Sequence, residues 1–148
     1  MFSRNPDQSS YDPFRLERFI AAQNPVFHHV LSELEAGSKT GHWMWFIFPQ
    51  IRGLGESPTS IEYAISSRDE AKAYLRHPVL GPRLKECARV VILVEGRSAH
   101  EIFGSPDDVK FRSSMTLFAE VSPDDDIFKR ALVKYFNDEP DPLTLDRL

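Results

Sequence analysis

Side chains that could hold an anionic, aromatic ligand are concentrated between residues 37 and 56. Both tryptophans of the chain, Trp43 and Trp45, and four of its seven glycines lie there. The same segment carries four cationic or amide-bearing side chains, which are Lys39, His42, Gln50 and Arg52. Tryptophans beside glycines and cations can form the wall of a ligand pocket, whereas aromatic runs in small domains also fill the core. Polar heads in such a segment must be exposed, paired or facing a ligand, because burying them alone is costly.

The glycines of this segment also have two interpretations. Gly53-Leu54-Gly55 is typical of a tight turn. Its backbone N–H groups could instead face an anion, because a helix is expected to begin just beyond it at Ser57-Pro58. The spacing of a Walker phosphate-binding loop is absent.

A second polar stretch runs from Asp107 to Thr116. On a helix, Lys110 and Ser113 share one side, and Asp107 precedes Lys110 by one turn. The stretch is either a solvated helix face with an Asp–Lys pair, or a polar patch that meets the aromatic segment at one cleft. Both interpretations remain open from the sequence.

Other chemistries find less support in the sequence. The five histidines form no pair with another histidine or a cysteine at helical spacing, and HExxH is absent, so we expect no metal site and no cofactor. Cys87 falls on an apolar helical stripe and is expected to be a buried thiol. Cleavage of a glycosidic bond would need a carboxylate and stacking rings. The residue types for it are present in Glu56, Glu62, Asp107, Asp108, Trp43, Trp45 and Tyr63.

Prolines predict the elements that position these side chains. Six prolines directly follow a good N-cap residue, in the pairs Asp12-Pro13, Asn24-Pro25, Ser57-Pro58, Ser105-Pro106, Ser122-Pro123 and Asp141-Pro142. Two capping boxes, Ser67…Glu70 and Ser98…Glu101, add further helix starts. The segments between these starts carry apolar residues at helical spacing. The run 90–94 could pass for a buried strand, but no second strand of similar quality exists to pair with it. We therefore predict an all-α fold, a single compact domain of about eight short helices with little or no sheet.

Composition places this fold in a small globular domain. The chain has 148 residues, of which 41% are hydrophobic and 27% charged, enough for one core without disulfides. We expect a flexible tail over residues 1–10 and one helical domain over residues 11–148. There is no membrane-length apolar run and no signal segment, and the only cysteine excludes an internal disulfide. The net charge of −4, with basic residues spread along the chain, argues against nucleic-acid or membrane binding. We expect a cytoplasmic monomer.

Short motifs along almost the whole chain resemble one family. They are Asp12-Pro13-Phe14, Arg18-Phe19, Ala22-Gln23, Lys39, His42 to Gln50, Gly53-Leu54-Gly55, Tyr63-Ala64-Ile65, Glu70-Ala71, Tyr74-Leu75, His77-Pro78, Leu80 to Leu84, Ile102-Phe103-Gly104, Lys110 to Phe118, Asp141 and Thr144-Leu145. With these motifs the chain resembles domain-of-unknown-function family 1810, a bacterial and fungal family that is often mislabelled calpastatin. A calpastatin-type inhibitor is disordered and poor in aromatics, whereas this chain has 11 phenylalanines and should fold alone. The resemblance implies a single, mainly helical domain. Near residues 137–139 the chain departs from the family, which usually has a glycine before the glutamate.

A looser similarity suggests what the domain binds. The order of an aromatic entry, a Tyr63 helix, a Glu70-Ala71-Lys72 helix and a late Lys110-Phe111 helix is similar to the superfamily linked to NAD and ADP-ribose derivatives, some of whose members are N-glycosidases. This similarity implies a small nucleotide-like ligand, with hydrolysis of an N-glycosidic bond as a further option. In those enzymes an acidic residue is typical, and Glu62 is the nearest candidate here.

Two hypotheses about function therefore stand. In the first, the domain binds a nucleotide-like small molecule. The candidate ligand-binding residues are Lys39, His42, Trp43, Trp45, Gln50, Arg52, Tyr63, Lys110 and Ser113. In the second, the domain is a non-catalytic protein-interaction module without a small-molecule ligand. A pocket lined by the aromatic segment favours the first, and full burial of both tryptophans without a cavity favours the second.

Overall fold

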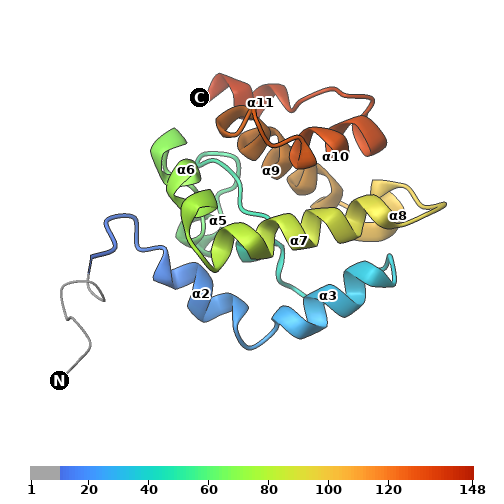
Figure 1. Ribbon diagram of the computed structural model, residues 1–148, viewed down its shortest axis with the longest axis horizontal. Coiled ribbons are helices and arrows are strands. Elements are labelled where there is room, and N and C mark those ends of the chain that lie inside the picture. Colours follow the sequence, from blue (N-terminus) through green and yellow to red (C-terminus); the bar gives the residue numbers. More distant parts are fainter. Residues whose placement is uncertain (1–10) are drawn as a thin grey trace.

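The computed structural model describes residues 11–148, and most of them are in helices (Figure 1). They are α2 (Glu17–Gln23), α3 (Phe27–Glu35), α4 (Met44–Ile47), α5 (Pro58–Glu62), α6 (Arg68–Arg76), α7 (Leu80–Leu93), α8 (Ala99–Phe103), α9 (Asp107–Val121), α10 (Ile127–Phe136) and α11 (Pro142–Asp146). No strand is present among these residues, apart from one isolated bridge between Ile51 and Ile65. The predicted all-α fold is confirmed, with ten helices in the described range where about eight were expected. The tail predicted for residues 1–10 lies outside the described residues.

Helix α7 runs through the middle of the domain (Figure 1). In this view α2 and α3 lie along one side of it, and α9, α10 and α11 lie on the other. Helices α3, α6 and α10 pack directly on α7, and α6, α8, α10 and α11 pack on α9. No described helix is both long enough and apolar enough to cross a membrane.

The core is rich in phenylalanine. Phe111 of α9 stacks on Phe103 at 4.7 Å between ring centroids and meets Phe48 edge-on at 4.9 Å. All three rings are at most 5% exposed. Aromatic pairs in such offset and edge-on geometries add stabilisation beyond the area that they bury. This cluster joins the segment after α4 to α8 and α9, so the aromatic run of residues 43–48 is held at the centre of the fold.

Two of the six proline pairs begin helices as predicted. Ser57 is the N-cap of α5 and its hydroxyl accepts a hydrogen bond from the Ser60 N–H, while Asp141 caps α11 through the Thr144 N–H. The predicted starts at Ser67 and Ser98 are also confirmed, and Ser98 forms a complete capping box with Glu101. Each cap satisfies a backbone donor that the first helical turn leaves unpaired.

The remaining pairs do not supply the N-cap residue. Asn24 is the C-cap of α2, and Ser122 is the C-cap of α9, where its hydroxyl donates back to the Phe118 carbonyl. The residue after Ser105 precedes α9 but forms no side-chain cap. Asp12 acts at a distance, since its carboxylate accepts the N–H groups of Leu16 and Glu17 at 2.8 and 2.9 Å at the start of α2. These prolines mark helix boundaries, because proline lacks the backbone N–H that a continuing helix needs, but they mark ends as well as starts.

The turn after α10 accommodates the departure from the family pattern. Asn137 and Asp138 both adopt left-handed backbone, with φ of 55° and 60°. Glycine enters this region freely, and asparagine and aspartate are the other residues that tolerate it. The helix therefore ends in left-handed backbone without a glycine at these positions.

Candidate functional site

A surface cleft of about 270 Å³ lies between the segment after α4 and the segment that includes α5. Trp45 and residues 50–53 and 55 line one side of it. Ser60, Ile61, Tyr63, Ala64 and Ser66 line the other side. The cleft thus forms in the aromatic and glycine-rich segment that the sequence singled out.

A short parallel pairing of backbone closes the base of the cleft. The Ile65 N–H donates to the Gln50 carbonyl at 2.8 Å, and the Arg52 N–H donates to the Ile65 carbonyl at 2.8 Å. Ile51 and Ile65 are both buried, at 2% and 0% exposure, so the pairing rests on the core. These bonds satisfy backbone groups where no helix runs, and they hold the two sides of the cleft at a fixed separation.

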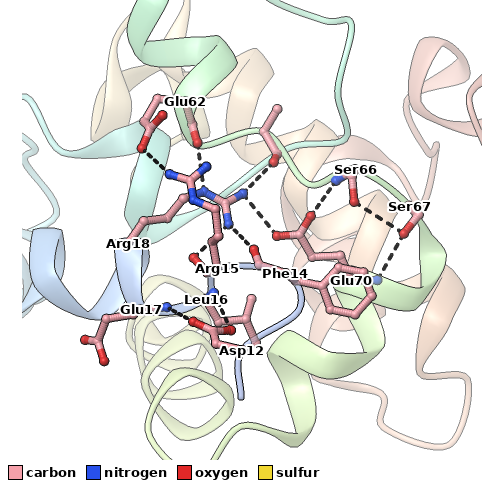
Figure 2. Close-up of polar contacts among 11 residues, drawn as sticks. Asp12, Phe14, Arg15, Leu16, Glu17, Arg18, Glu62, Ser66, Ser67 and Glu70 are labelled. Atoms are coloured by element: carbon pink, nitrogen blue, oxygen red, sulfur yellow. Dashed lines mark hydrogen bonds and ion pairs between the residues drawn. The ribbon is translucent and has the colours of Figure 1, made fainter. Parts of the chain in front are cut away.

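A buried ion pair supports the cleft from behind (Figure 2). Arg18 of α2 and Glu70 of α6 lie 3.0 Å apart, with side chains only 10% and 3% exposed. Arg18 also donates to the Ala64 carbonyl at 2.8 Å, and Glu70 accepts the Ser66 N–H at 2.8 Å. Ala64 and Ser66 line the cleft, so this pair fixes the backbone of one wall.

Two aromatic rings form the apolar part of the cleft. Trp45 and Tyr63 are both half-buried and both line it. Tyr63 packs against Phe46 and Phe19, with ring centroids 5.4 and 5.8 Å away, so its ring is held from behind. The ammonium group of Lys110 lies 4.9 Å from the centroid of the Trp45 ring, in a cation–π contact.

Four of the nine predicted site residues therefore meet in one cleft, namely Trp45, Gln50, Arg52 and Tyr63. Lys110 touches this group through Trp45 without lining the cleft itself. Of the second polar stretch, on α9, Lys110 is thus the residue that contacts an aromatic ring lining the cleft.

Lys39 lies inside the protein and its charge is already compensated. Its ammonium group is 2.7 Å from an Asp107 carboxylate oxygen and donates to the Gly41 carbonyl at 2.5 Å. The other Asp107 oxygen lies 3.6 Å from Lys110. With its side chain only 7% exposed, Lys39 connects the loop before α4 to the start of α9. We leave it out of the proposed site.

Trp43 is part of the core and its indole N–H has a partner. The residue is 3% exposed and donates to Glu33 at 3.0 Å. Glu33 also accepts the backbone N–H groups of Thr40 and Gly41. Burial alone would raise the pKa of Glu33, but these hydrogen bonds outweigh it and lower that pKa. Trp43 is thus a core residue, as one interpretation of the aromatic run expects, and Trp45 lines the pocket, as the other interpretation expects.

His42 and Ser113 also lie away from the cleft. His42 is exposed and is not among the lining residues. Ser113 is buried and donates to Asp141 at 2.9 Å, and Asp141 in turn accepts the hydroxyl of Thr144 at 2.6 Å. Ser113 therefore helps to anchor α11 on α9.

The electrostatic character of the cleft is set by Arg52. This side chain is exposed and forms no ion pair or hydrogen bond with any residue of the described range. No carboxylate lines the cleft within that range. Glu62, the nearest candidate for a catalytic acid, points to Arg15 at 3.0 Å (Figure 2). The arrangement can hold an anion beside an aromatic ring, and among residues 11–148 it presents hydroxyl groups, those of Ser60, Tyr63 and Ser66, but no carboxylate or imidazole.

Sequence reasoning missed the Arg18–Glu70 pair. Arg18 and Glu70 fall inside motifs of the family resemblance, but their contact spans 52 residues of sequence. A signal existed in Glu70, which is the glutamate of the predicted capping box Ser67…Glu70. In the structure its carboxylate accepts the N–H of Ser66, one residue before the N-cap.

The comparisons with known proteins place the chain in a family. The family described as "Protein of unknown function (DUF1810)" matches residues 13–148. A solved structure, that of the conserved hypothetical protein Rv1873 from Mycobacterium tuberculosis, is 55% identical in sequence and superposes with a TM-score of 0.92. The match covers 93% of this chain and 98% of that one. The comparison with curated proteins found no match. With a family match over nearly its whole length, the chain belongs to the DUF1810 family of proteins of unknown function.

Proposed function

We propose that the cleft binds a small nucleotide-like molecule of the NAD or ADP-ribose class. A base or nicotinamide ring would lie against Trp45 or Tyr63, and an anionic group would bind Arg52. The supporting observation is that two half-buried aromatic rings, the Gln50 side chain and a guanidinium that has no ion-pair partner among residues 11–148 share one cleft. An apolar wall with a few polar groups is the usual composition of a small-molecule site.

The size of the cleft suits part of such a ligand. Clefts for drug-sized molecules have volumes of roughly 300–1,000 Å³, and this cleft has about 270 Å³. It would enclose one ring and its ribose, and the rest of a dinucleotide would lie over the rim. Binding would then depend on a charged contact at the rim as well as on stacking inside.

The proposal is for binding and does not include cleavage. Hydrolysis of an N-glycosidic bond needs a carboxylate close to the sugar to stabilise positive charge or to activate water. In the described range Glu62 pairs with Arg15, and Asp107 pairs with Lys39 and Lys110. Glu56 is exposed and follows Gly55, but it is not among the residues that line the cleft.

Thermal shift and calorimetry with NAD⁺, ADP-ribose and AMP test the proposal. A ligand at 100 times its Kd should stabilise the fold by about 2.7 kcal/mol. We expect Arg52→Ala to remove the shift while leaving the unliganded melting temperature unchanged, because the Arg52 side chain is exposed and has no partner within the described residues. The matched control is Arg130→Ala on α10, an exposed arginine away from the cleft, which should bind as the wild type does.

Two results would contradict the proposal. One is that none of the three ligands shifts the melting temperature of the wild type at millimolar concentration. The other is that Arg52→Ala and Arg130→Ala bind equally well. Either result would favour the interaction module, in which Trp45 and Tyr63 contact a protein partner.

A further inference from the structure

A second arginine reaches the rim of the cleft from the far end of the chain. Arg147 directly follows α11. Its guanidinium lies over Gly53, a residue that lines the cleft and follows Arg52 in sequence. Like Arg52, Arg147 is exposed, and its side chain forms no ion pair or hydrogen bond within residues 11–148. The other arginines packed around the cleft wall, Arg15 and Arg18, are both paired with glutamates.

Gly53 allows this approach. A Cβ atom at this position would lie 2.8 Å from Cζ and 2.9 Å from Nη1 of Arg147, closer than side chains ever pack. Its φ of +92° is also a conformation that other residues rarely adopt. The turn at residues 52–55 is thus shaped so that a guanidinium rests directly on its backbone. Of the two interpretations that the sequence offered here, the positive φ of Gly53 fits the tight turn, and the anion-facing loop stays a prediction.

Helix α11 is anchored firmly enough to hold Arg147 in place. Asp141 at its start is 7% exposed and accepts hydrogen bonds from Ser113 and from Thr144, while its own N–H donates to Thr116 at 2.9 Å. Ser113 and Thr116 belong to α9. The predicted site residue Ser113 therefore acts on the cleft indirectly, by fixing the helix that delivers Arg147.

We propose that Arg52 and Arg147 together form a diphosphate subsite at the rim of the cleft. This inference rests on the proposed function, because the subsite extends the same ligand out of the cleft. Guanidinium groups bind phosphate oxygens through paired hydrogen bonds, and two of them match a group with two linked phosphates. The Arg147 guanidinium lies over Gly53, the residue next to Arg52, and two cations in one region favour a doubly charged anion. The ligand class then narrows to nucleoside diphosphate derivatives.

Calorimetry with ADP-ribose, which has two phosphates, and with AMP, which has one, tests the subsite. We expect Arg147→Ala to weaken the binding of ADP-ribose by about tenfold or more and the binding of AMP by less than about threefold. Only the longer ligand loses a charged contact. Arg52→Ala should weaken both ligands, and Arg147→Lys should recover part of the affinity for ADP-ribose. Arg130→Ala is the control, and circular dichroism with thermal melting should show that every variant is folded.

Inorganic pyrophosphate, with inorganic phosphate as its control, tests the subsite without the aromatic contacts. Pyrophosphate should raise the melting temperature of the wild type more than phosphate does, and Arg147→Ala should abolish the difference. If no nucleotide binds but this difference is seen, the proposed function fails and the subsite stands. If the nucleotides bind but Arg147→Ala weakens the binding of ADP-ribose and of AMP equally, or of neither, the subsite is overturned and the proposed function stands. Failure of the nucleotides and of pyrophosphate overturns both.

Discussion

Replacing Arg18 by methionine should strongly destabilise the domain. Its guanidinium donates to four carbonyl oxygens, those of Glu62, Phe14, Arg15 and Ala64, and to the carboxylate of Glu70. Figure 2 shows these bonds converging on the Arg18 side chain from the segment before α2, from α5, from the segment before α6 and from α6 itself. Methionine keeps much of the apolar volume but none of the donors, so the change isolates the polar network.

The magnitude follows from burial. Each of the five hydrogen bonds contributes about 1 kcal/mol net. The loss also leaves the Glu70 carboxylate, which is 3% exposed, without its cation. Removing one partner of a buried ion pair typically costs about 3–5 kcal/mol. Both arguments predict a loss of about 3–5 kcal/mol in the free energy of unfolding, a large part of the roughly 5–15 kcal/mol that holds a domain together.

Urea unfolding followed by circular dichroism measures the loss as a shift in midpoint at constant slope. Arg15→Met is the matched control, because Arg15 lies three residues away and pairs with Glu62, but both side chains are exposed, at 66% and 47%. Exposed pairs contribute about 0–1 kcal/mol. If Arg18→Met costs no more than Arg15→Met, the network does not support the fold and the reasoning is refuted.

Three further predictions concern single residues. Glu33→Gln should lower the free energy of unfolding by about 1–2 kcal/mol at pH 7. Because the folded protein lowers the pKa of Glu33 below 4.5, this loss should be present above that pH and should fade as the pH falls further. Urea unfolding at pH 7 and at pH 3 measures the difference. A loss independent of pH would contradict this. Gly81→Ala should destabilise by about 3 kcal/mol or more, because its Cβ would lie 2.1 Å from the Leu75 carbonyl oxygen, and a variant with wild-type melting temperature would show that α7 can shift freely. Burial raises the pKa of Cys87 to about 12, so a disulfide reagent at pH 8 should label it only in step with unfolding, and rapid labelling of the native protein would be the contrary result.

Much of the fold could be predicted from the sequence, because helix signals are local. A capping serine or aspartate acts within four residues, so Ser57, Ser98 and Asp141 were identified correctly. Proline pairs are less specific, because a proline without a backbone N–H is tolerated in the first turn of a helix and also just after a helix ends. Asn24 and Ser122 show this, and only the three-dimensional packing of α2 and α9 determines which end they mark.

The candidate site was only partly accessible to sequence reasoning. Aromatic and cationic residues that are close in sequence led to Trp45, Gln50 and Arg52, which do share a cleft. Nothing local distinguishes Trp45 from Trp43, because the difference lies in Glu33 of α3, which binds the indole of Trp43. The position of Arg147 beside Gly53 could not be predicted either, because it depends on how α11 packs on α9.

The paired backbone at the base of the cleft has a thermodynamic consequence. The two hydrogen bonds that link residues 50–52 to Ile65 are already formed in the unliganded protein, and they seat on buried isoleucines. A ligand that enters such a cleft finds its walls at their final separation, so little conformational entropy is lost in ordering them. The amide protons of Arg52 and Ile65 belong to the part of the chain that opens rarely, and their exchange with solvent should be slow whether or not the cleft is occupied. Affinity differences between ligands would then report on the contacts at the walls and the rim, and not on loop closure.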